Sequence, residues 1–174
     1  MRCVSPSARA RTKALNPPFN GTPMTRADPI SYLEPTQDAG RRFVQRNLAG
    51  PVVMLNLLRF RAVADYSGHP ELAPARPISG AEAFKLYVEH TLPFLRETGG
   101  DLLFLGHGGP FLIGPTDEHW DLAMMIRQAS TASFLSFASH KGYLAGLGHR
   151  TAAVMDSRLL PLSEMALPVA GARP

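Results

Sequence analysis

The sequence predicts a mixed α+β fold in a single domain. The chain has 174 residues, of which 45% are apolar and 18% charged, and this balance is typical of a globular protein with one core. Short apolar segments of strand length alternate with two longer segments in which apolar residues recur every three or four positions. Their order along the chain is β-α-β-β-α-β, which is the split βαβ pattern of a ferredoxin-like sheet with both helices on one face.

The first expected elements are a short extra helix and a buried strand. Thr36 is a candidate N-cap for a helix over 36–48, and Gly50-Pro51 ends it. Residues 52–60 form a near-continuous apolar run, which is typical of a central strand covered on both faces. Asn56 stands inside this run, and its polar side chain therefore needs an explanation.

A long loop and a capped helix are expected next. Residues 61–78 contain one glycine and three prolines, and a loop of this length inside a compact domain is often functional. Ser79 and Glu82 have the spacing of a capping box, so the first long helix is expected to begin there. Gly99-Gly100 is expected to end it.

The rest of the chain is expected to supply two strands, a helix and a final strand. The strands are predicted at 101–106, with a possible extension over 111–114, at 119–128 and at 151–160, and the helix begins at about 131. The strands are too apolar to face water on the side away from the helices, so a second copy of the chain is the simplest cover. The sequence therefore predicts a homodimer.

The positive charge of the chain is concentrated at its start. The net charge is +4 and the isoelectric point about 9.6. Residues 1–26 carry five basic residues and no acid, whereas the rest of the chain carries thirteen basic and fourteen acidic residues. The basic balance therefore gives no reason to expect a nucleic-acid partner. Two interpretations of this start stay open: a start codon assigned upstream of Met24, or a targeting segment.

Three segments are expected along the chain. They are a disordered basic leader over 1–28, one ferredoxin-like domain over 29–163, and a flexible tail over 164–174. No run approaches the roughly 18 apolar residues of a membrane-spanning helix, and the leader lacks the apolar core of a secretory signal. We therefore expect a cytoplasmic protein without a membrane partner, and the excess of arginine over lysine, 15 to 3, indicates a GC-rich bacterial gene. A single cysteine, Cys3, excludes an intrachain disulfide and a Cys-rich zinc site.

Several short segments are distinctive in their order along the chain. They are PVVMLNLLRF at 51–60, Gly99-Gly100 before a strand, Trp120-Asp121, Phe134 with Tyr143, and RTAA followed by DSRL within 150–159. In this order they resemble the DUF1330 family of uncharacterised proteins, over about 50–160. The resemblance implies a dimeric α/β barrel in which two ferredoxin-like sheets pack face to face. It implies no reaction, and the loop at 61–78 and the helix at 36–48 depart from the family pattern.

Asn56, Asp121 and Arg127 are the candidate ligand-binding residues. A buried amide without partners costs about 1–3 kcal/mol, so Asn56 either orients a ligand in a cavity or bonds a neighbouring loop. Asp121 and Arg127 lie six residues apart on one expected strand and therefore on one face, as do Asp156 and Arg158 on the last strand. Such charges either bind an anionic substrate through a bidentate arginine or pair within the fold or across a dimer interface.

His107, His90 and Tyr87 are the candidate catalytic residues. His107 follows a strand end, and His90 lies near Tyr87 on the first long helix, so either histidine can serve as a general base and the tyrosine as a proton donor. The alternative is that the histidines lie on a helix face or in a loop and that Tyr87 belongs to the core. If these side chains and Asn56 converge on an open pocket, an enzyme is favoured. If they lie in separate packed regions, the enzyme hypothesis loses its basis.

Two functions follow from these expectations. One is a cofactor-independent enzyme, a homodimer that acts on a small carboxylated or aromatic molecule. The alternative is a non-enzymatic dimer that binds a small ligand or has a structural role. No cofactor and no metal are expected, because the six histidines lack metal-ligand spacing and no nucleotide-binding motif is present. A haem-degrading variant of the enzyme would use Asn56 and Trp120, but no histidine is suitably placed for it.

Overall fold

The structure is a computed structural model that describes residues 31–165. The expected leader over 1–28 and the tail beyond residue 165 lie outside the described residues. The elements in chain order are α1 (Gln37–Gln45), β1 (Val52–Phe60), a short 3-10 helix (Pro70–Leu72), α2 (Gly80–Glu97), β2 (Gly100–His107), β3 (Leu122–Gln128), α3 (Thr131–Ala138), α4 (Lys141–Ala145), α5 (Leu147–Ala153) and β4 (Val154–Ser163).

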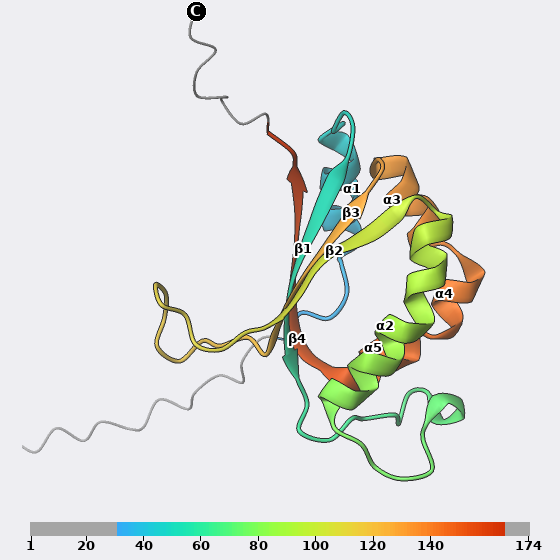
Figure 1. The fold of residues 1–174 in the computed structure, drawn as a ribbon, viewed down its shortest axis with the longest axis vertical. Helices are drawn as coiled ribbons and strands as arrows, with labels where there is room; N and C mark the ends of the chain where they lie inside the picture. Colours follow the sequence, from blue (N-terminus) through green and yellow to red (C-terminus); the bar gives the residue numbers. More distant parts are fainter. Residues whose placement is uncertain (1–30, 166–174) are drawn as a thin grey trace, which may run out of the picture.

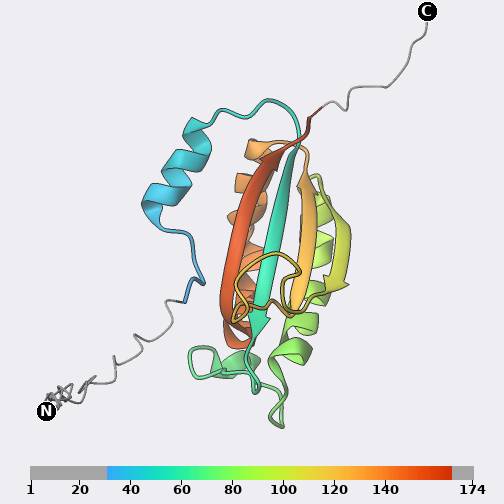
Figure 2. The ribbon, with the colours of Figure 1, turned by 90° about the vertical axis from the view of Figure 1, so that its left-hand side faces the viewer.

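The four strands form one antiparallel sheet in the order β2-β3-β1-β4. Strands β1 and β3 are therefore central. The predicted α+β class with a ferredoxin-like order of elements is confirmed. Figure 1 shows helices α2, α4 and α5 on one side of the sheet, and Figure 2 shows its other side facing the viewer without a helix in front of it. Helix α1 stands beside the β4 edge (Figure 2).

Four boundaries differ from the sequence prediction. The first helix ends at Gln45 and not at residue 48, because Asn47 directly after its C-cap has a left-handed backbone with φ 46°. Residues 151–153 end helix α5 instead of opening the last strand, because Ala152 and Ala153 are small enough to be fully buried. The third strand begins at Leu122 and not at residue 119, because His119 only bridges to Pro110 across a loop. The expected strand extension over 111–114 is wrong, because β2 ends at His107, directly before Gly108-Gly109-Pro110.

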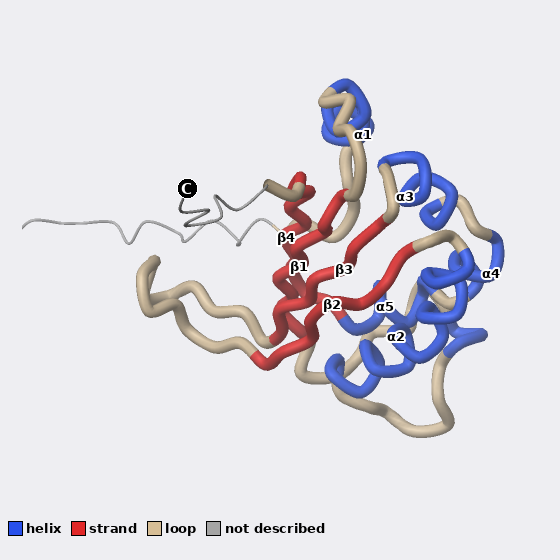
Figure 3. The backbone as a smooth tube through the Cα atoms, turned by 45° about the horizontal axis from the view of Figure 1, so that its top comes forward, coloured by secondary structure: helices blue, strands red, loops and turns tan. Residues whose placement is uncertain are grey.

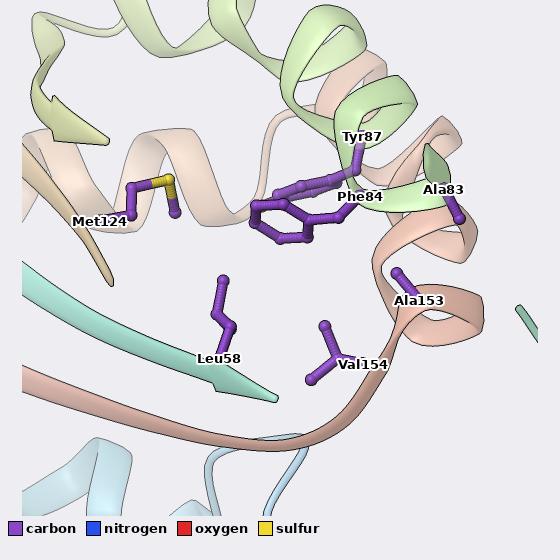
Figure 4. Packing of buried hydrophobic residues seen from close by; sticks show 7 residues of the cluster. All are labelled: Leu58, Ala83, Phe84, Tyr87, Met124, Ala153 and Val154. Carbon is purple, nitrogen blue, oxygen red and sulfur yellow. The ribbon is translucent and has the colours of Figure 1, made fainter. Parts of the chain in front are cut away.

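The core lies between the sheet and helix α2. Leu58, Met124 and Val154 point from three strands toward Phe84 and Tyr87 of α2 (Figure 4). Burial of each large apolar side chain stabilises the fold by about 1.5–3 kcal/mol. The expected capping box fixes the start of α2. The Ser79 N–H donates to Glu82 Oε2 at 2.8 Å, and the Glu82 N–H donates to Ser79 Oγ at 3.2 Å.

The opposite side of the sheet is also apolar over its centre, with charged residues toward the two ends of the strands, and no helix or strand within residues 31–165 covers it. Side chains alternate along a strand, and cross-strand partners point to the same side. The register therefore places the following residues on the side away from the helices: Val53, Leu55 and Leu57 of β1, Ala123 and Met125 of β3, Phe104 of β2, and Leu160 and Leu162 of β4. We call this side the open face.

Residues 108–119, which we call the arm, connect β2 to β3 and project from the sheet on the side of the open face (Figures 1 and 3). Backbone hydrogen bonds hold its base: the Gly108 N–H donates to the Asp121 carbonyl at 2.9 Å, and the Trp120 N–H to the Gly109 carbonyl at 3.2 Å. A Cβ atom at Gly108 would lie 2.2 Å from the Trp120 carbonyl oxygen, so this position requires glycine.

Candidate functional site

A cavity of about 270 Å³ opens where the arm meets the open face. Its lining comes from two strands and the arm: Arg59 of β1, Asp156 and Arg158 of β4, Trp120, and Pro115, Asp117 and Glu118 of the arm. Arg59 and Asp156 are cross-strand partners, so the sheet itself brings them together. The cavity is thus a feature of the tertiary fold, with walls that lie far apart in the sequence.

Asp156 is the buried centre of this site. Its Oδ1 accepts hydrogen bonds from the backbone N–H groups of Tyr32 and Ser157, both at 2.9 Å, and from Arg158 Nη1 at 2.8 Å. Its Oδ2 lies 3.6 Å from Arg59 Nη2. The predicted shared face of Asp156 and Arg158 is confirmed. The carboxylate holds both arginines at the cavity wall.

Two aromatic rings hold Arg158 from the side. Its guanidinium carbon lies 4.7 Å from the centre of the Tyr32 ring and 5.0 Å from the centre of the Trp120 ring. Such cation–π contacts contribute about 0.5–2 kcal/mol each. Trp120 is buried, and its indole Nε1–H donates to Glu118 Oε1 at 3.0 Å. The wall around Arg158 is therefore fixed in both position and orientation.

Arg59 has one hydrogen-bond donor, Nε, without a partner among residues 31–165. Its side chain is 20% exposed, but this Nε is buried. A buried donor on a charged group without a partner is costly, by at least about 1–3 kcal/mol. Arg59 itself lines the cavity, so the exposed part of its guanidinium side chain is available to a ligand there, whereas the buried Nε is not accessible to solvent.

The structure does not bring the three predicted ligand-binding residues together. The register places Asn56 on the helix side of the sheet, opposite Met124, and its Nδ2 donates to the Met54 carbonyl at 3.1 Å. Asp121 Oδ2 accepts from the Phe60 N–H at 2.7 Å and ties the strand end in place. Arg127 Nε donates to Glu164 Oε1 at 2.7 Å. Their role in ligand binding stays a prediction.

The predicted catalytic residues also lie in separate environments. Tyr87 is buried in the core, and this burial raises the pKa of its hydroxyl far above its usual range. The ring Nε2 of His90 is 2.7 Å from the Gly142 carbonyl, so this histidine joins α2 to the α4 turn. His107 is exposed at the end of β2. These side chains share no open pocket, and their catalytic role stays a prediction without a common site.

Sequence reasoning missed a second polar pair in the helix layer. The Tyr66 hydroxyl and His149 Nδ1 are 2.8 Å apart, and this contact ties the loop over 61–78 to α5. Burial, together with the nearby His90, lowers the pKa of His149, and burial raises the pKa of Tyr66. The two residues are 83 positions apart, so no local motif could reveal the pair.

The described part of the chain contains no group of three or more His, Cys, Asp or Glu side chains placed to hold a metal ion. Between residues 31 and 165 no helix is both long and apolar enough to cross a membrane.

The fold and site define a class: a ferredoxin-like α+β protein with an open apolar sheet face and a charged cavity beside it. Two crystal structures of RPA0582, a protein of unknown function from Rhodopseudomonas palustris, are similar to this chain. One, of the methylated protein, is 34% identical with a TM-score of 0.69, and the match covers 79% of this chain and 98% of RPA0582. The other is 33% identical with the same TM-score, over 79% and 100%. The chain belongs to the same family as RPA0582.

More distant likenesses concern the fold alone. A dimeric ferredoxin-like protein of unknown function from Thermobifida fusca is 14% identical, with a TM-score of 0.40 over 66% of this chain and 92% of its own. This likeness is too low to bear on assembly or function. No protein-family model matches the chain, and no curated protein matches it.

Proposed function

We propose that this protein is a homodimer that binds a small carboxylate in the cavity beside Arg59. The observation that supports this most directly is the Arg59 side chain, which is 20% exposed, lines the cavity and lies 3.6 Å through Nη2 from Asp156 Oδ2. A guanidinium group suits a carboxylate because its N–H groups match the two oxygens in geometry and charge. A volume of about 270 Å³ suits a small organic molecule and lies near the lower end of the usual range for such sites.

The charges of the cavity narrow the ligand further. Its lining contains two arginines but also three carboxylates, Asp117, Glu118 and Asp156. A second negative charge on the ligand would therefore meet repulsion at short range. A hydroxyl or amine group on the ligand has acceptors on this wall. A small hydroxy- or amino-carboxylate thus combines one anionic end for Arg59 with one donor for the acidic wall.

A second copy of the chain is the proposed cover of the open face. This face carries apolar side chains from all four strands, and Phe104 and Leu160 on it are about half exposed, at 51% and 52%. Contiguous apolar surface of this kind marks an interaction site, and a two-fold dimer buries the same face of both copies at once. The assembly would be the dimeric α/β barrel that the resemblance to DUF1330 implies, and we extend the proposal to membership of that family.

A cofactor-independent enzyme is the less supported alternative. It needs a base and a proton donor around one ligand, whereas Tyr87, His90 and His107 lie in three separate places. The proposal is therefore ligand binding without assigned chemistry. The expected cytoplasmic location rests on the sequence alone, and cell fractionation followed by immunoblotting tests it.

Thermal-shift titration with glycolate, lactate, glycine and serine tests the ligand class. A bound carboxylate stabilises the native state, so the melting temperature is expected to rise with concentration. The variant Arg59→Gln is expected to bind about tenfold more weakly or worse, since it loses a charge-assisted donor. The variant Arg96→Gln changes an exposed arginine of α2 outside the cavity and should bind as the wild type does. Equal affinity in all three proteins would refute the assigned site.

A further inference from the structure

The tip of the arm exposes three apolar side chains in a row. Phe111 is 42% exposed, Ile113 is 92% exposed, and Leu112 is fully exposed at 100%. Single exposed apolar residues are normal on a protein surface, but a contiguous run on a projecting segment marks a contact surface. Residues 108–116 carry no charge, so neither an oppositely charged partner nor the headgroups of an anionic membrane are favoured.

The arm is held out from the sheet by its base. Besides the backbone bonds at Gly108 and Gly109, a bridge joins Pro110 to His119, and the Asp121 N–H donates to the Leu58 carbonyl at 2.9 Å. The base thus continues from the sheet, next to the buried Trp120. The exposed tip is therefore presented by an ordered support.

The direction of the arm indicates what it meets. Figures 1 and 3 show it leaving the sheet on the side opposite the helices, which is the side that a second copy would occupy. Two sheets that pack face to face lie about 10 Å apart, so a segment that rises from one sheet reaches the level of the other subunit. A two-fold axis would apply this contact twice, once for each arm.

We propose that the arm tip, Phe111 to Ile113, docks on the second copy and extends the interface beyond the open face. The inference rests on the proposed homodimer and adds a specific contact to it. It also concerns the cavity, because Pro115, Asp117 and Glu118 belong both to the arm and to the cavity lining. Docking of the tip would hold that wall in place, so the ligand site is complete only in the dimer.

Sedimentation velocity over a concentration series tests the contact. The double variant Leu112→Ser/Ile113→Ser is expected to raise the dimer dissociation constant about tenfold or more, since four apolar side chains per dimer lose their buried position. The matched control is Val63→Ser/Leu144→Ser, which removes two exposed apolar side chains away from the arm. It should leave the dissociation constant unchanged. An unchanged constant in the tip variant overturns the inference and leaves the homodimer standing.

A fluorescent label gives a second readout that does not depend on the tip variant. In a Cys3→Ser background, Leu112→Cys carries an environment-sensitive dye. Its emission should be blue-shifted in the dimer and shift to the red on dilution below the dissociation constant. If the dye emits as it does in water while the protein sediments as a dimer, the tip does not dock on the second copy. If the wild-type chain is monomeric at every concentration, both the homodimer and tip docking are contradicted. Failure of tip docking alone is therefore distinguishable from failure of the homodimer. Flotation of the wild type, but not of Leu112→Ser/Ile113→Ser, with phosphatidylcholine–phosphatidylglycerol vesicles would assign the tip to a lipid surface instead.

Discussion

Arg59 and Asp156 are direct cross-strand partners on β1 and β4, with 3.6 Å between Nη2 and Oδ2. The carboxylate of Asp156 is nearly inaccessible and forms an ion pair with Arg59 at Nη2, while the buried Nε of Arg59 has no hydrogen-bond partner among residues 31–165. Arg59 is therefore fixed in position and incompletely bonded. A side chain in this state is prepared for a ligand, because its orientation does not have to be acquired on binding.

Asp156→Asn is expected to destabilise the fold by about 2–4 kcal/mol. The change removes the charge that faces both Arg59 and Arg158, and it replaces one carboxylate oxygen with an NH2 donor, which then faces either Arg59 or the N–H donors now bound to Oδ1. Urea unfolding followed by circular dichroism measures the loss. Asp38→Asn is the control, since Asp38 forms an exposed pair with Arg42 on α1 and should contribute about 0.5 kcal/mol or less. Equal losses in the two variants would mean that Asp156 does not organise the site.

Leu55→Lys is expected to yield a folded monomer. Leu55 lies on the open face, opposite Met125 and Leu160, so a lysine there places a charge at the centre of the proposed interface. The ammonium group can reach water in the monomer, and the fold should survive with an unchanged circular dichroism spectrum. Light scattering gives the mass. Leu58→Ala, on the helix side, should instead cost about 2–5 kcal/mol of stability and leave the assembly intact. A dimeric Leu55→Lys would remove the open face from the interface.

Much of the fold could be predicted because its signals are local. The capping box needs only Ser79 and Glu82, and the apolar run over 52–60 shows a buried strand without reference to any partner. The end of β2 was less clear, since Phe111 to Ile113 has a strand-like composition. The structure exposes this segment at the arm tip, and an apolar pattern cannot tell burial inside the chain from burial against another molecule.

The candidate site could not be predicted to the same degree. Alternation shows that Asp156 and Arg158 share a face, but the partner of Asp156 depends on the register between β1 and β4, which no local pattern determines. The chemical type of the histidines and of Tyr87 makes them candidates, but chemical type does not determine position, and the fold places them in separate environments. Asn56 is distinctive in the sequence as a polar residue in an apolar strand, but its amide donates to the Met54 carbonyl of the same strand.

Stability is expected to fall as the pH is lowered from about 6.5, the usual pKa of histidine, toward the lower pKa of His149 in the folded chain. His149 has a lowered pKa in the folded chain, chiefly because of burial and secondarily because of His90. The unfolded chain therefore takes up a proton first as the pH falls through about 6.5, and stability is lost from there downward toward the folded pKa. His149→Gln should flatten the melting temperature over this window, whereas His107→Gln, at an exposed position, should retain the wild-type slope. An unchanged slope in His149→Gln would assign the pH dependence to other groups.

Ligand and dimer are expected to stabilise each other. The arm contributes Pro115, Asp117 and Glu118 to the cavity, and its tip is proposed to dock on the second copy. Both events then favour the same arm conformation, and linkage requires that each strengthens the other by the same factor. The carboxylate with the largest thermal shift should, at saturation, lower the dimer dissociation constant by about 5-fold or more. Sedimentation velocity with and without that compound measures this factor. The effect should vanish in Leu112→Ser/Ile113→Ser, where the tip no longer docks, and in Arg59→Gln, where the compound no longer binds. A ligand that binds with equal affinity to monomer and dimer would show that the arm does not connect the two.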